Sequence, residues 1–136
     1  MAWVVDTCLL IDVAEADPRF GIASAQLLDR QRIDGLVICP ASDVELAPVF
    51  SGDDSLQEQF LHSLAVSCRE PWTAADTRAA RQAWHQYVTR RRTAPTPKRP
   101  LADVLIGAFA MRFDGILTRN EADFRQLFPT LKVLTP

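Results

Sequence analysis

Short apolar runs alternate along the chain with longer segments whose apolar residues recur at helical spacing. The short runs predict five β-strands, at residues 2–5, 36–39, 65–67, 115–118 and 131–134. The longer segments predict helices at residues 8–14, 18–32, 42–48, 56–64, 73–92, 101–112 and 120–128. Strands that are apolar on both faces and alternate with helices are typical of parallel sheets with right-handed crossovers. The pattern therefore predicts an α/β fold.

Capping residues mark two of the predicted helix starts. Ser42 and Glu45 have the spacing of a capping box, and Thr73 and Asp76 have a similar arrangement. Pro48 predicts that the helix opened by Ser42 is short or kinked. Three prolines between residues 93 and 100 preclude regular structure in that segment.

The bulk composition narrows the class of protein. At 136 residues and 48% hydrophobic content, the chain is long enough for one domain, over residues 1–136, with its own core. The net charge of −2 indicates no particular partner. Three cysteines without C-x-x-C spacing and two distant histidines favour reduced thiols and exclude a zinc motif. Asp6 interrupts the first apolar run too early for a signal peptide, and residues 104–111 are too few to span a membrane. We therefore expect a cytoplasmic protein.

Polar side chains lie where the predicted strands end and the predicted helices begin. Asp6 ends the first strand, and Glu45 and Asp103 fall in the first turns of two helices. Asn120 and Asp123 follow the fourth strand. Asp103 also belongs to the buried stripe of an apolar helix, which is unusual for a carboxylate. The carboxyl ends of parallel strands share the edge where such sheets bind ligands, and clustered oxygen ligands suit Mg²⁺ or Mn²⁺.

Each acidic residue also has a purely local interpretation. Glu45 fits a capping-box glutamate, and Asp123 fits the acidic residue of a helix capped by Asn120. Asp103 fits a first-turn partner of the helix dipole, and Asp6 fits a turn at a strand end. The convergence of all these positions on one sheet edge favours a shared site over independent local roles.

The ordered set of segments resembles a PIN domain. The segments are Val4-Val5-Asp6-Thr7, Glu45 at a helix start, residues 101–108 (LADVLIGA) and residues 117–124 (LTRNEADF). Within that family, size and spacing are most similar to the VapC-type toxins of bacterial toxin–antitoxin pairs, and the resemblance covers the whole chain. It implies a three-layer α/β/α fold around a mostly parallel sheet, and metal-dependent cleavage of RNA phosphodiester bonds.

The resemblance also implies roles for individual residues. Asp6, Glu45 and Asp103 match the acidic positions that bind Mg²⁺ or Mn²⁺ and are catalytic. The fourth position falls on Asn120, where many members carry Asp, and Asp123 would then supply the missing charge. The implied partners are an RNA substrate, a cognate antitoxin protein and a second copy of the chain in a homodimer, with no membrane.

Five basic residues and no acidic residue lie between positions 90 and 99: Arg90, Arg91, Arg92, Lys98 and Arg99. They fit a helix C-terminus followed by a solvated linker. They also fit phosphate contacts, because an acidic metal site needs nearby positive charge to hold a polyanion. Thr7 and Thr118, beside the acidic positions, are further candidates for RNA contact.

Other hydrolytic chemistries lack their residues. Neither His62 nor His85 lies at a strand end, so a Ser or Cys triad has no base, and an aspartyl phosphatase would need Asp where Cys8 stands. Two hypotheses follow. The first is a metal-dependent endoribonuclease that is the toxin of a toxin–antitoxin pair. The second is a PIN-like module that binds RNA or protein without cleaving, which Asn120 keeps open.

Overall fold

The computed structural model of the chain describes residues 2–93 and 100–136. Its described strands form one wholly parallel sheet in the order β3-β2-β1-β4-β5. From edge to edge, these are Val66–Ser67, Leu36–Val37, Trp3–Val5, Gly115–Leu117 and Val133–Leu134. All five strands predicted from the apolar runs are present, and the expected α/β fold is confirmed.

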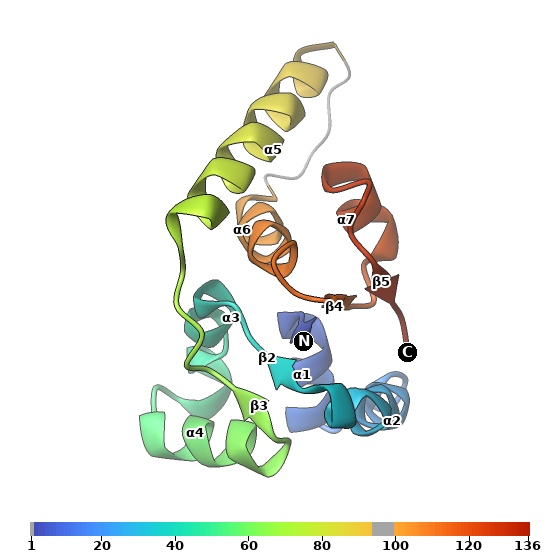
Figure 1. Ribbon diagram of the computed structural model, residues 1–136. Helices are drawn as coiled ribbons and strands as arrows, with labels where there is room; N and C mark the ends of the chain where they lie inside the picture. The colour runs from blue at the N-terminus through green and yellow to red at the C-terminus, as the bar shows by residue number, and fades with distance from the viewer. Residues whose placement is uncertain (1, 94–99) are drawn as a thin grey trace.

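Helices connect the strands throughout the described chain (Figure 1). The α-helices are α1 Thr7–Ala14, α2 Gly21–Gln31, α3 Pro40–Glu45, α4 Asp54–Ser63, α5 Ala74–Thr93, α6 Leu101–Ala110 and α7 Glu121–Leu127. Two short 3₁₀ helices, η1 Arg32–Asp34 and η2 Ala47–Phe50, follow α2 and α3. None of the described helices is long and apolar enough to cross a membrane.

The helices cover both faces of the sheet, which gives three layers (Figure 1). Side chains alternate between the faces along each strand. In β1, Val4 therefore belongs to the core beneath α5, α6 and α7, which contains Phe109 and Phe124. Val5 belongs to the opposite core beneath α1, α2 and α4, which contains Leu9. The α/β/α layering expected from the family resemblance is confirmed.

Helices α6 and α7 pack unusually closely at Gly107. A Cβ atom on Gly107 would lie 2.3 Å from Cε2 of Phe128 and 3.3 Å from a ring carbon of Phe124. Only glycine permits this approach without displacing a buried ring. The contact fixes α7 against α6, and these helices carry three of the predicted site residues, Asn120 at the start of α7, Asp123 and Asp103.

The predicted start of α3 is wrong. The helix begins at Pro40, with Cys39 at the N-cap, because proline is preorganised for the first helical position. Ser42 is therefore not an N-cap but lies buried inside α3, and its Oγ has no hydrogen-bond partner among the described residues. Glu45 is the last residue of α3 rather than a first-turn residue, so the helix dipole does not favour its charge. The helix is short, as Pro48 predicted.

Two other predicted helix starts have different outcomes. At the start of α5 the reciprocal cap is present, because Asp76 N–H donates to Thr73 Oγ1 at 3.3 Å and Thr73 N–H donates to Asp76 Oδ2 at 2.9 Å. Helix α2 begins at Gly21 instead of residue 18. Asp17 instead accepts hydrogen bonds from the backbone of Arg19 and Phe20, both at 2.8 Å, in the turn before α2.

Candidate metal centre

Asp6 lies at the carboxyl end of the central strand, where β1 meets α1. Its side chain is buried, with 3% of the residue exposed. It occupies the N-cap position of α1 but makes no capping hydrogen bond to that helix. Its Oδ2 instead accepts hydrogen bonds from the Thr118 hydroxyl at 2.6 Å and from the Cys8 thiol at 3.3 Å. Strand β4, which is paired with β1, brings Thr118 to this position.

The Thr118 hydroxyl is oriented by its own surroundings. Thr118 is fully buried, and its Oγ1 accepts a hydrogen bond from the backbone N–H of Asn120 at 2.9 Å. Because the Asn120 N–H can only donate, the hydroxyl hydrogen of Thr118 is available for the Asp6 carboxylate oxygen, which can only accept when it is ionised. The burial of Thr118 favours a role in holding Asp6 over direct contact with RNA.

Glu45 is held near Asp6 by a hydrogen bond from Thr7. The Thr7 hydroxyl donates to Glu45 Oε1 at 2.7 Å, and Thr7 directly follows Asp6 in the chain. Glu45 itself is exposed. The end of α3 and the start of α1 thus bring two carboxylates to the same edge of the sheet.

The two acidic side chains and the thiol influence one another. Burial raises the pKa of the Asp6 carboxyl above its ordinary value; the Thr118 and Cys8 hydrogen bonds oppose this rise, and the charge of Glu45 adds to it. Burial, together with the charge of Asp6, raises the pKa of the Cys8 thiol to about 12. Cys8 therefore stays protonated at neutral pH and acts as a hydrogen-bond donor to Asp6.

Among the buried carboxylates of the described chain, Asp6 differs from the others in its partners. Asp12 pairs with Arg119 and Asp76 pairs with Arg112, each through a nitrogen–oxygen distance of 2.7 Å. Asp6 receives only neutral donors from the described residues. A buried carboxylate without a cation is costly, so this position favours a positively charged ligand.

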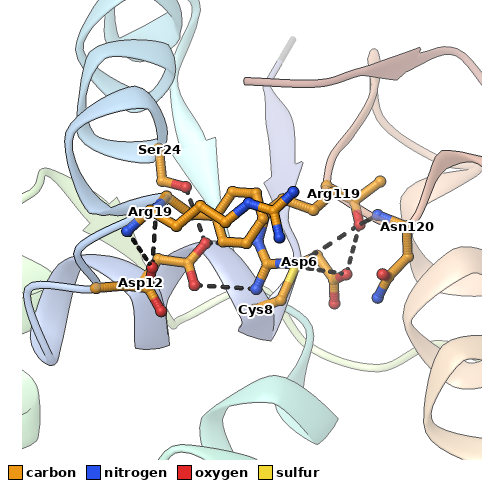
Figure 2. Close-up of polar contacts among 10 residues, drawn as sticks. Asp6, Cys8, Asp12, Arg19, Ser24, Arg119 and Asn120 are labelled. Atoms are coloured by element: carbon orange, nitrogen blue, oxygen red, sulfur yellow. Dashed lines mark hydrogen bonds and ion pairs between the residues drawn. The ribbon is translucent and has the colours of Figure 1, made fainter.

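Beside this carboxylate lies a network that the sequence interpretation missed (Figure 2). Arg119 donates through Nε and Nη2 to the two oxygens of Asp12, at 2.7 and 3.0 Å. Ser24 of α2 also donates to Asp12, at 3.0 Å, and the Arg119 guanidinium lies 4.0 Å from the centre of the Phe20 ring. The sequence did contain one indication of this network. Asp12 is a carboxylate within an apolar helix, which is the feature that made Asp103 a candidate site residue.

The remaining predicted acidic residues lie in first turns of helices. Asp103 is half-buried in the first turn of α6, and Asp123 is half-buried in the first turn of α7. Asn120 is the exposed N-cap residue of α7, but its side chain makes no capping hydrogen bond. Within residues 2–93 and 100–136, no three acidic, histidine or cysteine side chains form a group that could hold a metal ion. Among the described residues, the fold thus brings Asp6 and Glu45 together but places no third carboxylate in a metal-binding group with them.

The predicted basic contacts lie mostly at the end of α5. Arg90 is exposed and Arg91 is half-buried in the last turns of this helix, whose carboxyl end extends away from the sheet (Figure 1). The side chain of Arg92 and the residues Lys98 and Arg99 lie outside the described part of the structure.

The oxygen atoms at this edge are of the kind that a hard divalent cation binds. The described residues do not, however, form a complete set of ligands around one point. Asp6 and Glu45 supply carboxylate oxygens, and Asp6 is buried with no cationic side chain among its described partners. Mg²⁺ and Mn²⁺ prefer oxygen ligands, and Mg²⁺ retains several waters when one or two carboxylates bind it. A site built around two carboxylates is therefore chemically consistent with either ion.

The chain is a parallel α/β/α protein with acidic residues at the carboxyl edge of its sheet. Proteins of this class bind their ligands at that edge. A family model described as the PIN domain matches residues 3–127. The chain therefore belongs to the PIN domain family, whose members are generally nucleases and typically use divalent metal ions. A search of curated proteins found no significant match to this chain.

Proposed function

We propose that the chain is a Mg²⁺- or Mn²⁺-dependent endoribonuclease and the toxin of a toxin–antitoxin pair of the VapC type. The observation that carries the nuclease proposal is Asp6, a buried carboxylate at the centre of the carboxyl edge in a PIN domain, with no cationic partner among the described residues. The toxin role, the cognate antitoxin and the homodimer rest on the resemblance of size and motif spacing to that group.

In this proposal the chain's own residues hold and orient the reactants. Asp6 and Glu45 are the primary cation ligands, and Thr7 and Thr118 fix their positions through hydrogen bonds of 2.7 and 2.6 Å. Asp103 and Asp123 complete the acidic site when RNA and cation assemble there, and the exposed Asn120 amide supplies a neutral oxygen. When bound, a divalent cation supplies Lewis acidity at the phosphate and a water that ionises near neutral pH.

The first test is the RNA cleavage activity of Asp103→Asn, because Asp103 also has a local interpretation as a helix-dipole partner. If Asp103 completes the cation site, we expect Mn²⁺-dependent cleavage to fall by more than about 100-fold, beyond the loss typical of residues that only support ligands. The matched control is Asp54→Asn, which removes an exposed acid from the first turn of α4. Both variants should lose only about 0.3–1 kcal/mol of stability. Full cleavage by Asp103→Asn would remove Asp103 from the site.

A second candidate function has its own support. No described group of three acidic, histidine or cysteine side chains could hold a metal ion, and the family resemblance places Asn120 where many members carry Asp. The chain therefore also fits a PIN-like module that binds RNA or protein without cleaving. Wild-type protein that binds RNA but shows no cleavage with either Mg²⁺ or Mn²⁺ would favour this function over the nuclease.

The carboxyl end of α5 is the proposed RNA-binding surface. We expect Arg90→Gln/Arg91→Gln to weaken RNA binding and to reduce the slope of log K against log salt by about 0.7 per lost phosphate contact. The matched control, Arg78→Gln/Arg81→Gln, removes two exposed charges from the first half of the same helix. Binding measured by fluorescence anisotropy at several salt concentrations separates the two pairs. Equal slopes for wild type and Arg90→Gln/Arg91→Gln would mean that these residues form only a solvated helix end.

A further inference from the structure

Arg119 stands between Thr118 and Asn120 in the chain, but its side chain turns away from Asp6 toward Asp12 (Figure 2). The pairing is two-pronged, with Nε and Nη2 donating to different oxygens of a carboxyl group that is 4% exposed. The Phe20 ring lies against the Arg119 guanidinium, and the Ser24 hydroxyl donates to Asp12. These contacts tie the loop after β4 to both α1 and α2.

Together with the chain itself, these contacts form a closed ring of bonded and hydrogen-bonded residues that includes Asp6. Helix α1 joins Asp6 to Asp12, and the ion pair joins Asp12 to Arg119. Arg119 is covalently attached to Thr118, whose hydroxyl returns to Asp6 Oδ2 at 2.6 Å. The ion pair therefore restrains Thr118 near Asp6, in addition to the backbone pairing of β4 with its neighbouring strands.

The ring includes a hydrogen bond that orients the carboxyl group of Asp6. The Thr118 hydroxyl and the Cys8 thiol both donate to Oδ2, and neither uses Oδ1. The Asp6 side chain also makes no capping bond to α1 that would turn it elsewhere. Fixing Thr118 therefore fixes the Asp6 rotamer, with the Thr118 and Cys8 side chains on Oδ2 and neither of them on Oδ1.

We propose that the Asp12–Arg119 pair is a positioning device that acts through Thr118 to hold Asp6 in its cation-binding orientation. The proposal rests on the proposed function, because it presumes that Asp6 binds Mg²⁺ or Mn²⁺. Arg119 contacts neither the cation nor the RNA in this scheme. Side chains that orient metal ligands in this way typically change metal affinity by 10- to 100-fold when they are mutated.

The test is the affinity of folded Arg119→Met for Mn²⁺ alone, measured by isothermal titration calorimetry. Methionine keeps an apolar stem for packing and removes the two-pronged pairing. We expect Mn²⁺ to bind about 10- to 100-fold more weakly than to wild type. If Arg119→Met does not fold, Arg119→Lys serves instead, because it keeps the charge but loses the paired geometry. The same weakening is expected.

Arg112→Met is a closely matched control. Arg112 pairs with buried Asp76 at the same 2.7 Å, and its side chain is 30% exposed, against 29% for Arg119. Arg112 precedes β4, however, whereas Arg119 follows it. We expect both methionine variants to melt at lower temperatures and only Arg119→Met to lose Mn²⁺ affinity. Equal losses of affinity would show a general effect of destabilisation and would overturn the proposal.

Substitutions at Thr118 test the route of the effect. Thr118→Val removes the hydroxyl and keeps the shape, so it should weaken Mn²⁺ binding as Arg119→Met does. Thr118→Ser keeps the hydroxyl and should bind Mn²⁺ like wild type. If both residues act by the same route, the double variant Thr118→Val/Arg119→Met should lose no more affinity than the weaker-binding single variant. Additive losses would overturn the proposal.

The outcomes for wild type separate this inference from the proposed function. If wild type binds Mn²⁺ and Arg119→Met binds it equally well, the positioning role is wrong and the metal site stands. If wild type does not bind Mn²⁺ at all, the proposed metal-dependent function fails and the positioning role fails with it.

Discussion

Asp6→Asn is expected to abolish Mn²⁺-dependent RNA cleavage, with a loss of more than about 100-fold. The amide keeps the shape of the side chain and can still accept the Thr118 hydrogen bond, but it removes the buried negative charge that attracts the cation. The same variant should lose the thermal stabilisation that Mn²⁺ gives to wild type. For a single site, that stabilisation is about 2.7 kcal/mol at a metal concentration 100 times the Kd.

Both effects are measurable on the same samples, by cleavage of a labelled RNA and by melting curves in EDTA and in Mn²⁺. Asp29→Asn is the control, because it makes the same change of charge at an exposed position on α2. It should leave both readouts unchanged. Cleavage by Asp6→Asn at the wild-type rate would exclude Asp6 from the cation site and would leave its burial unexplained.

The metal-free Asp6→Asn protein should respond to pH differently from wild type. Burial raises the pKa of the Asp6 carboxyl, with an added rise from Glu45, so the folded state binds this proton more tightly than the unfolded chain. The stabilisation from that proton is complete below the ordinary pKa of 3.8 and is lost as pH rises through the higher folded pKa. In EDTA, Asp6→Asn should therefore be more stable than wild type near neutral pH, and this advantage should shrink as pH falls toward 4. An advantage that does not vary with pH would contradict the assignment.

The sheet and the position of Asp6 were predictable because they depend on local patterns. Short apolar runs mark buried parallel strands, and the five predicted runs became the five strands of the described sheet. The cap at Thr73 and Asp76 was predictable for the same reason, since both of its partners lie within one turn. Interactions between residues only a few positions apart can therefore be predicted from their spacing in the sequence.

Interactions between distant segments were not predictable in this way. Ser42 and Glu45 have the spacing of a cap, but Pro40 starts α3 earlier and moves Glu45 to the helix end, where the Thr7 hydroxyl holds it. The pairing of Asp12 with Arg119 spans 107 positions and depends on β1 and β4 being neighbours. A single sequence does not show which strands are neighbours or how they are aligned. Arg119 could therefore be identified as the partner of Asp12 only from the structure.

Arg112→Met is expected to produce the largest loss of stability among the variants considered, about 3 kcal/mol, or roughly 10 °C in Tm. Arg112 Nε and Nη2 donate to the two oxygens of Asp76 at 2.7 and 3.0 Å, and Nη2 also donates to the Pro71 carbonyl at 3.0 Å. The Asp76 side chain is fully buried, and hydrogen bonding to it raises the pKa of Arg112. Removing the guanidinium leaves a buried charge with no cation.

The double variant Arg112→Met/Asp76→Asn distinguishes this cause from lost packing. Arg112 also lies over the Phe109 and Phe113 rings, at 5.1 and 5.0 Å, and a methionine replaces part of that contact. Asn at position 76 can still accept the Thr73 N–H but carries no charge, so the double variant should recover at least half of the stability lost by Arg112→Met. Chemical denaturation at neutral pH gives the three free energies of unfolding. A double variant less stable than Arg112→Met would mean that the aromatic contacts and the helix cap, rather than the unpaired carboxylate, account for the loss.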